Sequence, residues 1–331
     1  MEYLQNIVGA ENVYHDEALK KHTTFRIGGP ARYFVTPRYI EDFVETIHYL
    51  QTKDYPYLIL GNGSNFLFQD EGYSGVVVST RGTGKTAKVK DKMEIDAINF
   101  YETEEEKEIL FQRIPELTDA KERFAGKTLV LAGCGIMLSS LAKNVIHKGL
   151  KGFAFAGGIP GTLGGAVTMN AGAYGGEIKD QIAGAMLLTD SGEQRFYSKE
   201  ELLLGYRTSV IQKENLIVLY AVFSFEKGDA VTEEAMMQEF NQRRREKQPL
   251  EYGSAGSTFK RPEGYFAGKL IEDAGLKGYR IGDIMVSDKH AGFVVNVGEG
   301  TYEQAMAVIA HVRETVKEQF GVELEMEVRT I

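Results

Sequence analysis

Glycine is concentrated in one stretch of the chain, from Lys151 to Ile178, where nine residues are glycine. Glycine loses more conformational entropy on folding than any other residue, so this concentration indicates a backbone that must come close to a ligand. Positions 156–175 contain no lysine or arginine. An anionic ligand there would therefore be held by backbone N–H groups, in a loop or at the start of a helix.

Two common glycine motifs do not account for this stretch. The dinucleotide-binding pattern G-x-G-x-x-G does not occur in it. The segment Gly84-Lys85-Thr86 resembles the end of a phosphate-binding P-loop, but the first glycine of that motif would fall on Ser79.

A second glycine-rich segment follows a short apolar run. Residues 57–65 read YLILGNGSN, which predicts a strand that ends in a tight, polar loop at Gly61–Asn65.

Both segments match the UDP-N-acetylenolpyruvoylglucosamine reductase family, which this chain resembles. The matching segments follow the family order along the whole chain: TTFRIGGPA (23–31), LGNGSN (60–65), GGIPGTLGGAVTMNAGAYG (157–175), GYRTS (205–209), GSAGSTF (253–259) and EVR (327–329). The resemblance implies an α+β fold, in which a two-lobed FAD-binding module of the vanillyl-alcohol-oxidase (PCMH) type precedes a C-terminal α+β substrate domain.

The resemblance also implies the domain boundaries. We expect the FAD module at residues 1–226, with lobes at about 1–80 and 81–226. The substrate domain is expected at residues 227–331, and its last strand returns toward the first lobe. The family pattern has a short hairpin between Val78 and Leu129, so this chain carries an atypical insertion at about 85–125.

The insertion contains a predicted helix. Thr103 and Glu106 fit a capping box, which predicts a helix from about Glu104 to Arg113 that ends near Pro115. Because charge runs usually face water, the acidic run at 102–108 favours a solvated surface segment without a catalytic role. A lid or a partner-binding arm is the alternative.

Periodicity and turn residues predict the other elements. Residues 1–22 are expected to be a short helical lead-in. Helices are expected at 40–50, 138–147, 232–247 and 301–320, and strands at 33–35, 57–60, 75–78, 129–131, 185–189, 193–197, 217–225 and 322–329.

The resemblance implies that both glycine-rich loops surround the pyrophosphate of FAD. The expected cofactor-binding residues are Gly61, Asn62, Gly63, Ser64, Asn65, Gly157, Gly158, Ile159, Pro160, Gly161, Gly164, Gly165, Asn170, Gly172 and Ala173.

The family reaction reduces the enolpyruvyl ether of UDP-N-acetylglucosamine to a lactyl ether, with NADPH as the reductant of FAD. When hydride adds to the carbon remote from the carboxylate, negative charge develops on the carbon next to the carboxylate. The site therefore needs a cation at the carboxylate and a proton donor at that carbon. The resemblance assigns Arg207 to the carboxylate, which a guanidinium binds through two hydrogen bonds. It assigns Ser257 as the proton donor. Because a serine hydroxyl is a weak acid and needs help as it loses its proton, we expect Lys260 or an ordered water to assist it.

The resemblance also selects Glu327 as the catalytic carboxylate. The sequence pattern alone leaves Glu323, Glu325 and Glu327 equivalent on one face of a strand. A carboxylate beside a developing anion repels it unless the carboxylate is protonated or paired.

Three further residues are expected to bind the substrate. Lys247 matches the family position at the substrate phosphates, although a basic residue that stabilises a helix end is an open alternative. Lys260 follows the serine motif. Tyr206 is expected to cover the substrate, because no separate tyrosine-bearing loop is inserted between Arg207 and Ser257.

Composition limits the possible partners. The net charge of −9 over 331 residues argues against a nucleic-acid or anionic-membrane surface. No apolar run approaches the ~20 residues that span a bilayer, and the N-terminus lacks the features of a signal peptide. The one cysteine, Cys134, is expected to be a small packed residue. No metal site is expected, because the histidines form no H-E-x-x-H pair.

We therefore expect a cytoplasmic, monomeric enzyme of peptidoglycan precursor synthesis that uses FAD and NADPH and acts on a nucleotide sugar. No feature of the sequence separates NADPH from NADH. Two alternatives remain: an FAD-dependent oxidase of a hydroxy acid or alcohol, and a non-catalytic protein that binds flavin or a nucleotide sugar.

Overall fold

The computed structural model describes residues 1–81 and 92–331. These residues form two compact units. The first unit comprises residues 1–13, 35–61 and 78–241, and the second comprises residues 14–34, 62–77 and 242–331. Each unit is thus assembled from segments that are far apart in the sequence. The predicted domain boundary near residue 226 stays a prediction.

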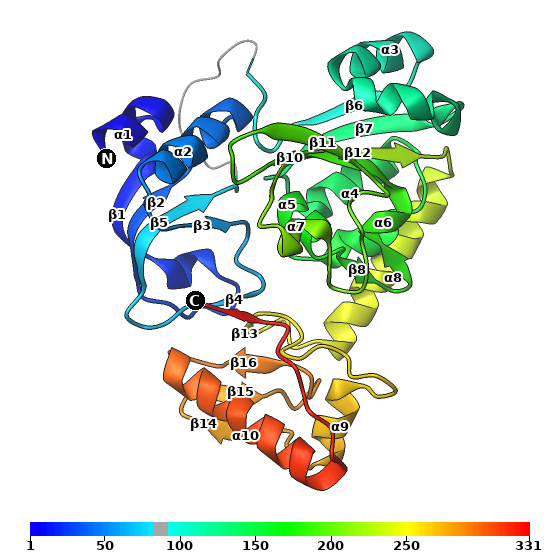
Figure 1. The fold of residues 1–331 in the computed structure, drawn as a ribbon. Coiled ribbons are helices and arrows are strands. Elements are labelled where there is room, and N and C mark those ends of the chain that lie inside the picture. Colours follow the sequence, from blue (N-terminus) through cyan, green and yellow to red (C-terminus); the bar gives the residue numbers. More distant parts are fainter. Residues whose placement is uncertain (82–91) are drawn as a thin grey trace. The chain divides into compact units, whose positions relative to one another are not determined.

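A five-stranded antiparallel sheet is the centre of the first unit (Figure 1). The strand order is β11-β10-β12-β7-β6. Its strands are β6 (Ile98–Tyr101), β7 (Thr128–Gly133), β10 (Ile182–Leu188), β11 (Gln194–Ser198) and β12 (Ile217–Phe225). The longest of them, β12, lies in the middle and is almost entirely buried, as its continuous apolar run predicts.

Helices and short strands complete the first unit. They are α1 (Glu2–Val8), η1 (Ala10–Asn12), α2 (Ile40–Thr52), β3 (Tyr57–Leu60), α3 (Glu104–Arg113), η3 (Pro115–Phe124), α4 (Leu138–His147), η4 (Ala154–Gly158), α5 (Leu163–Thr168), β8 (Gly172–Ala173), β9 (Gly176–Glu177), α6 (Ile178–Gln181) and α7 (Val210–Lys213). Helix α8 (Ala230–Lys247) begins in this unit, and its last residues belong to the second. Phe153, Phe223 and Phe225 pack together beneath the sheet, with ring centroids 5.4 to 6.0 Å apart.

The predicted helix of the insertion is confirmed, but the segment is more than a solvated decoration. The Thr103 hydroxyl accepts a 3.2 Å hydrogen bond from the Glu106 amide, and the Glu106 carboxylate accepts one of 3.0 Å from the Thr103 amide. The buried Lys107 donates to the Phe124 carbonyl at 3.2 Å and so joins α3 to η3. Strand β6, from the same segment, extends the sheet. Residues 85–91 of the predicted insertion lie outside the described residues.

The second unit contains two larger sheets and a pair of strands. Strands β1 (Val13–Ala18), β2 (Pro30–Val35) and β5 (Tyr73–Ser79) are consecutive neighbours, and a four-stranded sheet has the order β13-β16-β15-β14. The strands of that sheet are β13 (Gly253–Ser254), β14 (Arg280–Ile281), β15 (Ile284–Val286) and β16 (Val294–Asn296). Strand β4 (Phe66–Leu67) pairs in parallel with β17 (Arg329–Thr330).

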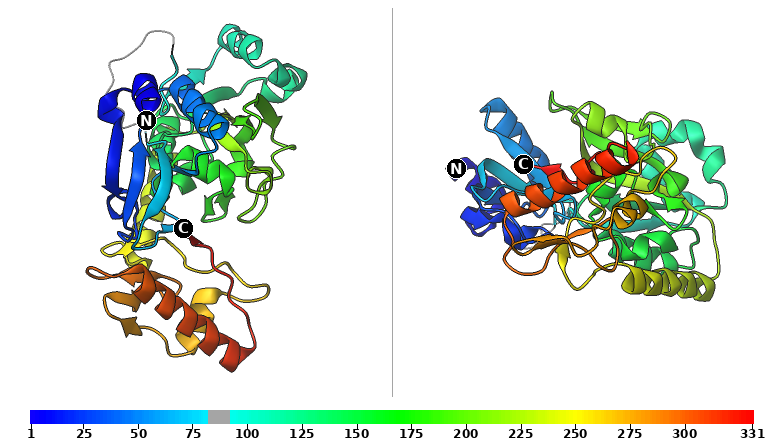
Figure 2. Two further views of the ribbon diagram at one scale, coloured as in Figure 1. Left: turned by 60° about the vertical axis from the view of Figure 1, so that its left-hand side comes forward. Right: turned by 90° about the horizontal axis from the view of Figure 1, so that it is seen from below.

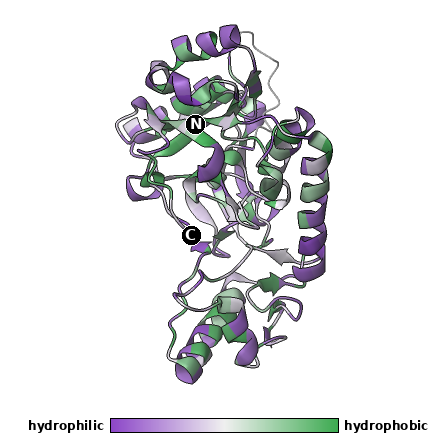
Figure 3. Ribbon diagram, turned by 90° about the vertical axis from the view of Figure 1, so that its right-hand side faces the viewer, coloured by the Kyte–Doolittle hydropathy of each residue, from purple (hydrophilic) through white to green (hydrophobic). Residues whose placement is uncertain are grey.

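Helix α10 (Tyr302–Phe320) covers the four-stranded sheet and supplies much of the core of the second unit (Figure 2). Its buried hydrophobic residues recur at helical spacing, with hydrophilic residues between them (Figure 3). Thr301 and Gln304 form the predicted capping box, and Gly321 ends the helix in the left-handed conformation with φ 69°. The remaining helices of this unit are η2 (Leu19–His22) and α9 (Ala267–Asp273).

Two sequence predictions are wrong. Residues 1–22 are not a helical lead-in throughout, because β1 lies within them. Its polar sequence is tolerated because β1 is at the edge of its sheet. Residues 322–329 do not form one strand. Within the described parts of the chain, only β17 and a single bridge from Met326 to Phe259 are paired. The alternating pattern there therefore reports the burial of Leu324 and Val328 and not a ladder of backbone hydrogen bonds.

No helix among the described residues is both long enough and apolar enough to span a membrane.

Candidate active site

The two glycine-rich loops meet at Gly61 and Thr162 in the first unit. A Cβ atom added to Gly61 would lie 2.3 Å from the Thr162 hydroxyl oxygen, so only glycine allows the first loop to approach the second this closely. The second loop is itself anchored. Gly161 accepts a 3.0 Å hydrogen bond from the Leu138 amide, and Gly164 donates one of 2.8 Å to the Cys134 carbonyl.

The hydroxyl of Thr162 is a buried polar group without a partner among the described residues. Thr162 is 1% exposed and directly precedes α5, yet its side chain does not cap that helix. A buried hydroxyl without a hydrogen bond costs about 1–3 kcal/mol, which a bound polar ligand or water removes. An unsatisfied donor where two glycine-rich loops converge fits the phosphate groups of the expected FAD.

The first loop continues into the second unit, where it is tied to the N-terminal segment. Gly63 has φ 60°, and a Cβ atom there would lie 2.2 Å from the His22 carbonyl oxygen. Its carbonyl accepts a 3.3 Å hydrogen bond from the Thr24 amide. Thr24 in turn donates through its hydroxyl to the Ser254 carbonyl at 2.6 Å. Thr24 therefore connects the loop to the segment that leads to Ser257.

Asn170 makes three side-chain hydrogen bonds with protein groups. Its amide nitrogen donates to the Glu177 carboxylate at 2.9 Å and to the Gly205 carbonyl at 3.0 Å, while its oxygen accepts from the Lys179 amide at 2.9 Å. The ion pair with Lys179 and the bond from Asn170 lower the pKa of the Glu177 carboxyl. Asn170 thus holds the end of the glycine-rich stretch against the segment before Tyr206. Its predicted contact with the cofactor stays a prediction.

Tyr206 and Arg207 form a two-residue turn. Gly205 and Thr208 exchange backbone hydrogen bonds of 3.0 and 3.4 Å on either side of it. Arg207 has φ 53°, a conformation that is uncommon for a residue with a side chain. Its carbonyl accepts a 3.1 Å hydrogen bond from Gln212. The turn therefore presents the guanidinium on a constrained backbone, 5.5 Å from the centroid of the Tyr206 ring.

Ser257 lies in the second unit between Gly256, which has a positive φ, and Thr258, which is held by hydrogen bonds. Gly256 before it has φ 79°. Thr258 after it is buried, its amide donates to the Gly292 carbonyl at 2.9 Å, and its hydroxyl accepts from the Val294 amide at 3.0 Å. Ser257 itself is exposed, so its hydroxyl is accessible while its backbone is held by Thr258.

The structure brings Glu327 next to the serine segment. The Glu327 amide donates a 2.9 Å hydrogen bond to the carbonyl of Thr258, the residue after Ser257. The first glycine-rich loop also contacts it, because the Asn65 side chain donates to the Glu327 carbonyl at 3.1 Å. The Asn65 carbonyl accepts from the Arg329 amide at 3.0 Å. Three predicted site residues, Asn65, Ser257 and Glu327, thus lie on hydrogen-bonded neighbouring segments.

Environment separates the three glutamates that the sequence pattern left equivalent. Glu323 forms an ion pair with Lys317 at 2.6 Å, and Glu325 forms one with Lys260; both carboxylates are largely exposed. Glu327 is only partly exposed. It is therefore the least exposed of the three, and its catalytic role stays a prediction.

The predicted substrate-binding lysines are both in the second unit. Lys260 is engaged with Glu325 through its side chain, and its amide also donates to the Glu325 carbonyl at 2.9 Å. A cavity of about 350 Å³ lies beside it, lined in part by Arg261 and Tyr265. Lys247 is exposed at the C-terminal end of α8. Arg207 and Tyr206 belong to the first unit.

Sequence reasoning missed two residues. Thr24 lies within the quoted TTFRIGGPA segment, and Thr162 lies between the predicted cofactor residues Gly161 and Gly164. The available sequence signal for Thr162 was a hydroxyl-bearing residue among glycines. The burial of that hydroxyl without a partner among the described residues is visible only in the folded chain.

The fold and these loops define an FAD-dependent oxidoreductase. Residues 112–197 match an FAD binding domain, and residues 248–331 match the C-terminal domain of UDP-N-acetylenolpyruvoylglucosamine reductase. The UDP-N-acetylenolpyruvoylglucosamine reductase of Lachnoclostridium phytofermentans is 47% identical over 331 residues, which are 100% of this chain and 96% of the relative. The corresponding enzyme of Alkaliphilus oremlandii is 44% identical over 328 residues, 99% of this chain and 96% of the relative.

A solved structure agrees with these relatives. The crystal structure of UDP-N-acetylenolpyruvylglucosamine reductase from Thermus caldophilus matches with a TM-score of 0.71 and 29% identity, over 96% of this chain and 97% of that one. The chain belongs to the UDP-N-acetylenolpyruvoylglucosamine reductase family. The predicted family, fold class, enzyme class and FAD cofactor are thereby confirmed.

Proposed function

We propose that this chain reduces the enolpyruvyl ether of UDP-N-acetylglucosamine to the lactyl ether of UDP-N-acetylmuramate, with Arg207, Ser257 and Glu327 as its catalytic residues. Bound FAD, reduced by NADPH, supplies the hydride. The observation that carries the proposal is the 2.9 Å hydrogen bond from the Glu327 amide to the Thr258 carbonyl, because it brings a hydroxyl and a carboxylate onto adjacent segments. The two expected cofactor loops carry the flavin.

Ser257 donates the proton to the carbon next to the substrate carboxylate. A serine hydroxyl is a weak acid, so it protonates only a strongly basic centre such as the enolate of this reaction. Thr258 fixes the backbone on one side of it, which limits the positions that the hydroxyl reaches. Glu327, on the adjacent segment, holds a proton or a hydrogen bond beside the enolate.

Arg207 binds the substrate carboxylate and stabilises the charge that builds next to it. Guanidinium geometry suits this task, because two parallel N–H groups match two carboxylate oxygens. Tyr206 covers the substrate from the same turn, and Lys247 binds the substrate phosphates. Lys260 reaches the substrate by leaving Glu325, which costs little because exposed ion pairs contribute only about 0–1 kcal/mol.

The test is an anaerobic experiment on the FAD-loaded chain that separates the two half-reactions. NADPH should bleach the flavin absorbance, and the enolpyruvyl sugar should then restore it. In Ser257→Ala, bleaching should proceed at its normal rate while recovery slows by about 100-fold or more, the contribution typical of a positioned proton donor. Fast recovery in this variant would remove the donor assignment from Ser257.

A neighbouring serine supplies the control. Ser254→Ala keeps the hydrogen bonds that the Ser254 backbone makes with the carbonyl and the hydroxyl of Thr24, so both half-reactions should stay close to normal. Flavin that is bleached by a hydroxy acid or alcohol and restored by O₂, with no response to the sugar, would support the oxidase alternative. Flavin that none of these compounds bleaches or restores would support the alternative of a non-catalytic binding protein.

The location and assembly of the chain are part of the same proposal. We expect the chain in the cytoplasm, where its nucleotide-sugar substrate is found, and we expect it to be a monomer. Sedimentation equilibrium of the FAD-loaded chain should give the mass of a single 36.8 kDa chain.

A further inference from the structure

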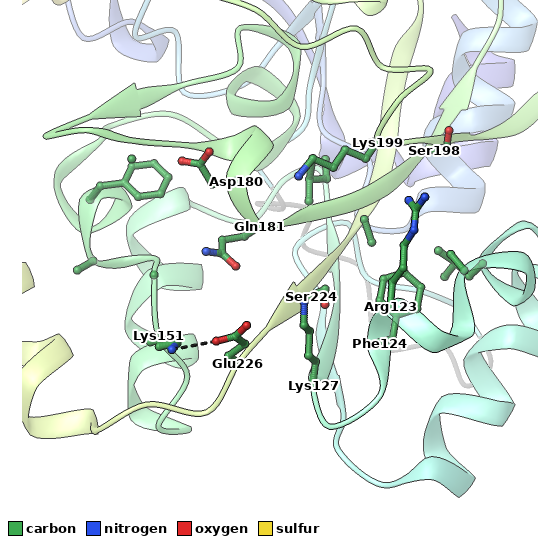
Figure 4. A pocket seen from close by; sticks show the side chains of 18 of the residues that line it. Arg123, Phe124, Lys127, Lys151, Asp180, Gln181, Ser198, Lys199, Ser224 and Glu226 are labelled. Carbon is green, nitrogen blue, oxygen red and sulfur yellow. Dashed lines mark ion pairs between the residues drawn. The ribbon is translucent and has the colours of Figure 1, made fainter.

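A large cavity lies in the first unit, away from the residues assigned above. Its volume is about 670 Å³, within the range of roughly 300–1,000 Å³ that is usual for small-molecule sites. Its walls come from η3, η4, α6, α8 and the ends of β10, β11 and β12 (Figure 4). None of the expected cofactor-binding or substrate-binding residues lines it. We call it the η3 cavity, because the inserted segment forms one wall.

The walls of the η3 cavity are aromatic and apolar at several points. Phe124 of η3, Phe155 of η4 and Phe196 of β11 line it, and each is at least 90% buried. At one side Tyr174 stacks on Phe240, with 4.6 Å between ring centroids and an interplanar angle of 7°. Aromatic side chains drawn from several elements of the first unit suit a flat, apolar ligand body.

Its polar groups offer donors that the protein does not use. The Ser224 hydroxyl oxygen is buried and has no hydrogen-bond partner among the described residues. Lys127 and Lys199 extend into the cavity from opposite edges (Figure 4). Within the described part of the chain, neither ammonium group has a carboxylate at ion-pair distance. Lys127 and Lys199 interact at longer range with Glu226 and Glu200, so one hydroxyl and two cations without close partners in that part of the chain are available to an anionic group.

The other charged groups that line the cavity are mostly satisfied. Lys151 pairs with Glu226 at 2.9 Å, and Arg123 pairs with Glu200 at 3.0 Å. The Asp180 carboxylate accepts from the Glu177 amide at 2.8 Å, and that of Glu233 accepts from the Gly152 amide at 3.1 Å. Glu116 is an exposed acid on η3.

We propose that the η3 cavity is a second small-molecule site, which takes an organic anion with a flat apolar body, of the aryl carboxylate class. The carboxylate binds Lys127, Lys199 and the Ser224 hydroxyl, and the ring packs against Phe124 and Phe155. A charge-assisted hydrogen bond is about twice as strong as a neutral one, so the site prefers a carboxylate to a neutral ligand of the same shape. This proposal rests on the cavity and not on the proposed reaction.

The test compares 2-naphthoate with its neutral analogue 2-naphthamide on the FAD-loaded full chain, by calorimetric titration. The naphthoate should bind about tenfold more tightly, the difference that one charge-assisted hydrogen bond makes. In the double variant Lys127→Gln, Lys199→Gln this preference should disappear while naphthamide binding stays the same. The control Lys148→Gln, Lys213→Gln removes the same charge from residues that do not line the cavity.

Two further variants locate the bound molecule. Ala120→Phe on η3 and Ala183→Leu on β10 each fill part of the cavity, so both should weaken both ligands by at least about tenfold, as loss of apolar burial predicts. Circular dichroism and flavin content show which variants have folded. One folded variant is sufficient to test whether the ligand binds in the cavity. The proposal would be overturned if the two ligands bound equally tightly, if binding survived the filled cavity, or if NADPH displaced the ligand. Absence of binding at millimolar concentration would also overturn it.

Discussion

The side-chain amide of Asn65 donates a 3.1 Å hydrogen bond to the main-chain carbonyl of Glu327, across 262 positions of sequence. The Asn65 carbonyl accepts from the Arg329 amide at 3.0 Å. A residue of the first glycine-rich loop therefore holds the backbone directly after the proposed catalytic carboxylate, at the Glu327 carbonyl and the Arg329 amide. We assign Asn65 a positioning role in addition to its predicted place beside the cofactor.

Replacement of Asn65 by alanine should impair the step that depends on Glu327. The loss of one buried hydrogen bond lets the Glu327 backbone move, so recovery of the reduced flavin by the sugar should slow by about tenfold to 100-fold at saturating FAD. Bleaching by NADPH should change less. A double-mutant cycle checks the mechanism: Asn65→Ala should add little to the defect of Glu327→Gln, because both changes remove the same function. Additive effects would mean that Asn65 acts independently of Glu327.

Two glycine variants should separate close packing of the loops from contact with the cofactor. In Gly61→Ala the new methyl group would lie 2.3 Å from the Thr162 hydroxyl oxygen. This variant should lose about 1–3 kcal/mol of stability even without FAD, as overpacking generally does. In Gly165→Ala the nearest atom is 4.0 Å away, so the apoprotein should keep its stability.

The FAD affinity of Gly165→Ala then tests the predicted cofactor contact. A Cβ atom at a position that the cofactor approaches should weaken FAD binding, whereas free space should leave the affinity unchanged. Thermal unfolding of the apoprotein and fluorescence titration with FAD measure the two effects. A stable variant with normal FAD affinity would remove Gly165 from the cofactor site.

Asn170→Ala should disturb the turn that carries Arg207. The variant loses hydrogen bonds to Glu177, Gly205 and the Lys179 amide, and alanine tolerates the observed φ of 43° less well than asparagine. We expect a loss of about 2–4 kcal/mol in the free energy of unfolding, measured in urea. The KM for the sugar should also rise, since Arg207 is less well placed, while a purely structural role would leave KM unchanged in the folded fraction.

The Glu177 carboxyl gives the same region a pH dependence. The Lys179 ion pair and the Asn170 bond lower the pKa of Glu177 in the folded chain, so the stabilisation is present above the ordinary glutamate pKa and is lost as the pH falls through the folded value. Glu177→Gln should therefore be less stable than the parent near pH 7, and the difference should become smaller in acid as the pH falls through the folded pKa. Equal stability at both pH values would show that this carboxylate makes no net contribution.

Cys134 should be unreactive in the folded chain. It is 1% exposed, and burial raises the pKa of its thiol, so the thiolate that attacks electrophiles is scarce. Because the unfolded thiol ionises near pH 8.5 and the folded thiol does not, this group favours folding fully below that pH and progressively less above it. Labelling by iodoacetamide at pH 8 should occur only in urea. Stoichiometric labelling under native conditions would contradict this environment.

Local sequence patterns predicted the elements whose signals lie within a few residues. Thr103 with Glu106 and Thr301 with Gln304 marked the starts of α3 and α10, because a capping box involves only residues three positions apart. The glycine-rich loops were equally visible, since glycine at such density has few structural uses. The family resemblance added the identities of Arg207, Ser257 and Glu327, which no spacing in this chain singles out.

The same patterns gave wrong predictions where the alternation of the side chains does not correspond to pairing of the backbone. Residues 322–329 alternate as a strand does, and Leu324 and Val328 are buried accordingly, yet most of their backbone has no strand partner. Strand β1 was missed for the converse reason: an edge strand is held by backbone hydrogen bonds that its polar side chains do not report.

The sequence by itself determined the glycine-rich loops and the positions of the capped helices, because these depend on periodicity and on contacts between near neighbours. Its resemblance to the family implied the class of the fold. Only the tertiary structure distinguished the environment of Glu327 from those of Glu323 and Glu325, left the Thr162 hydroxyl buried without a partner among the described residues, and linked Asn65 to Glu327. These properties depend on burial and on hydrogen bonds between distant segments. Such contacts exist only after the hydrophobic cores have brought those segments together, and no local spacing encodes them.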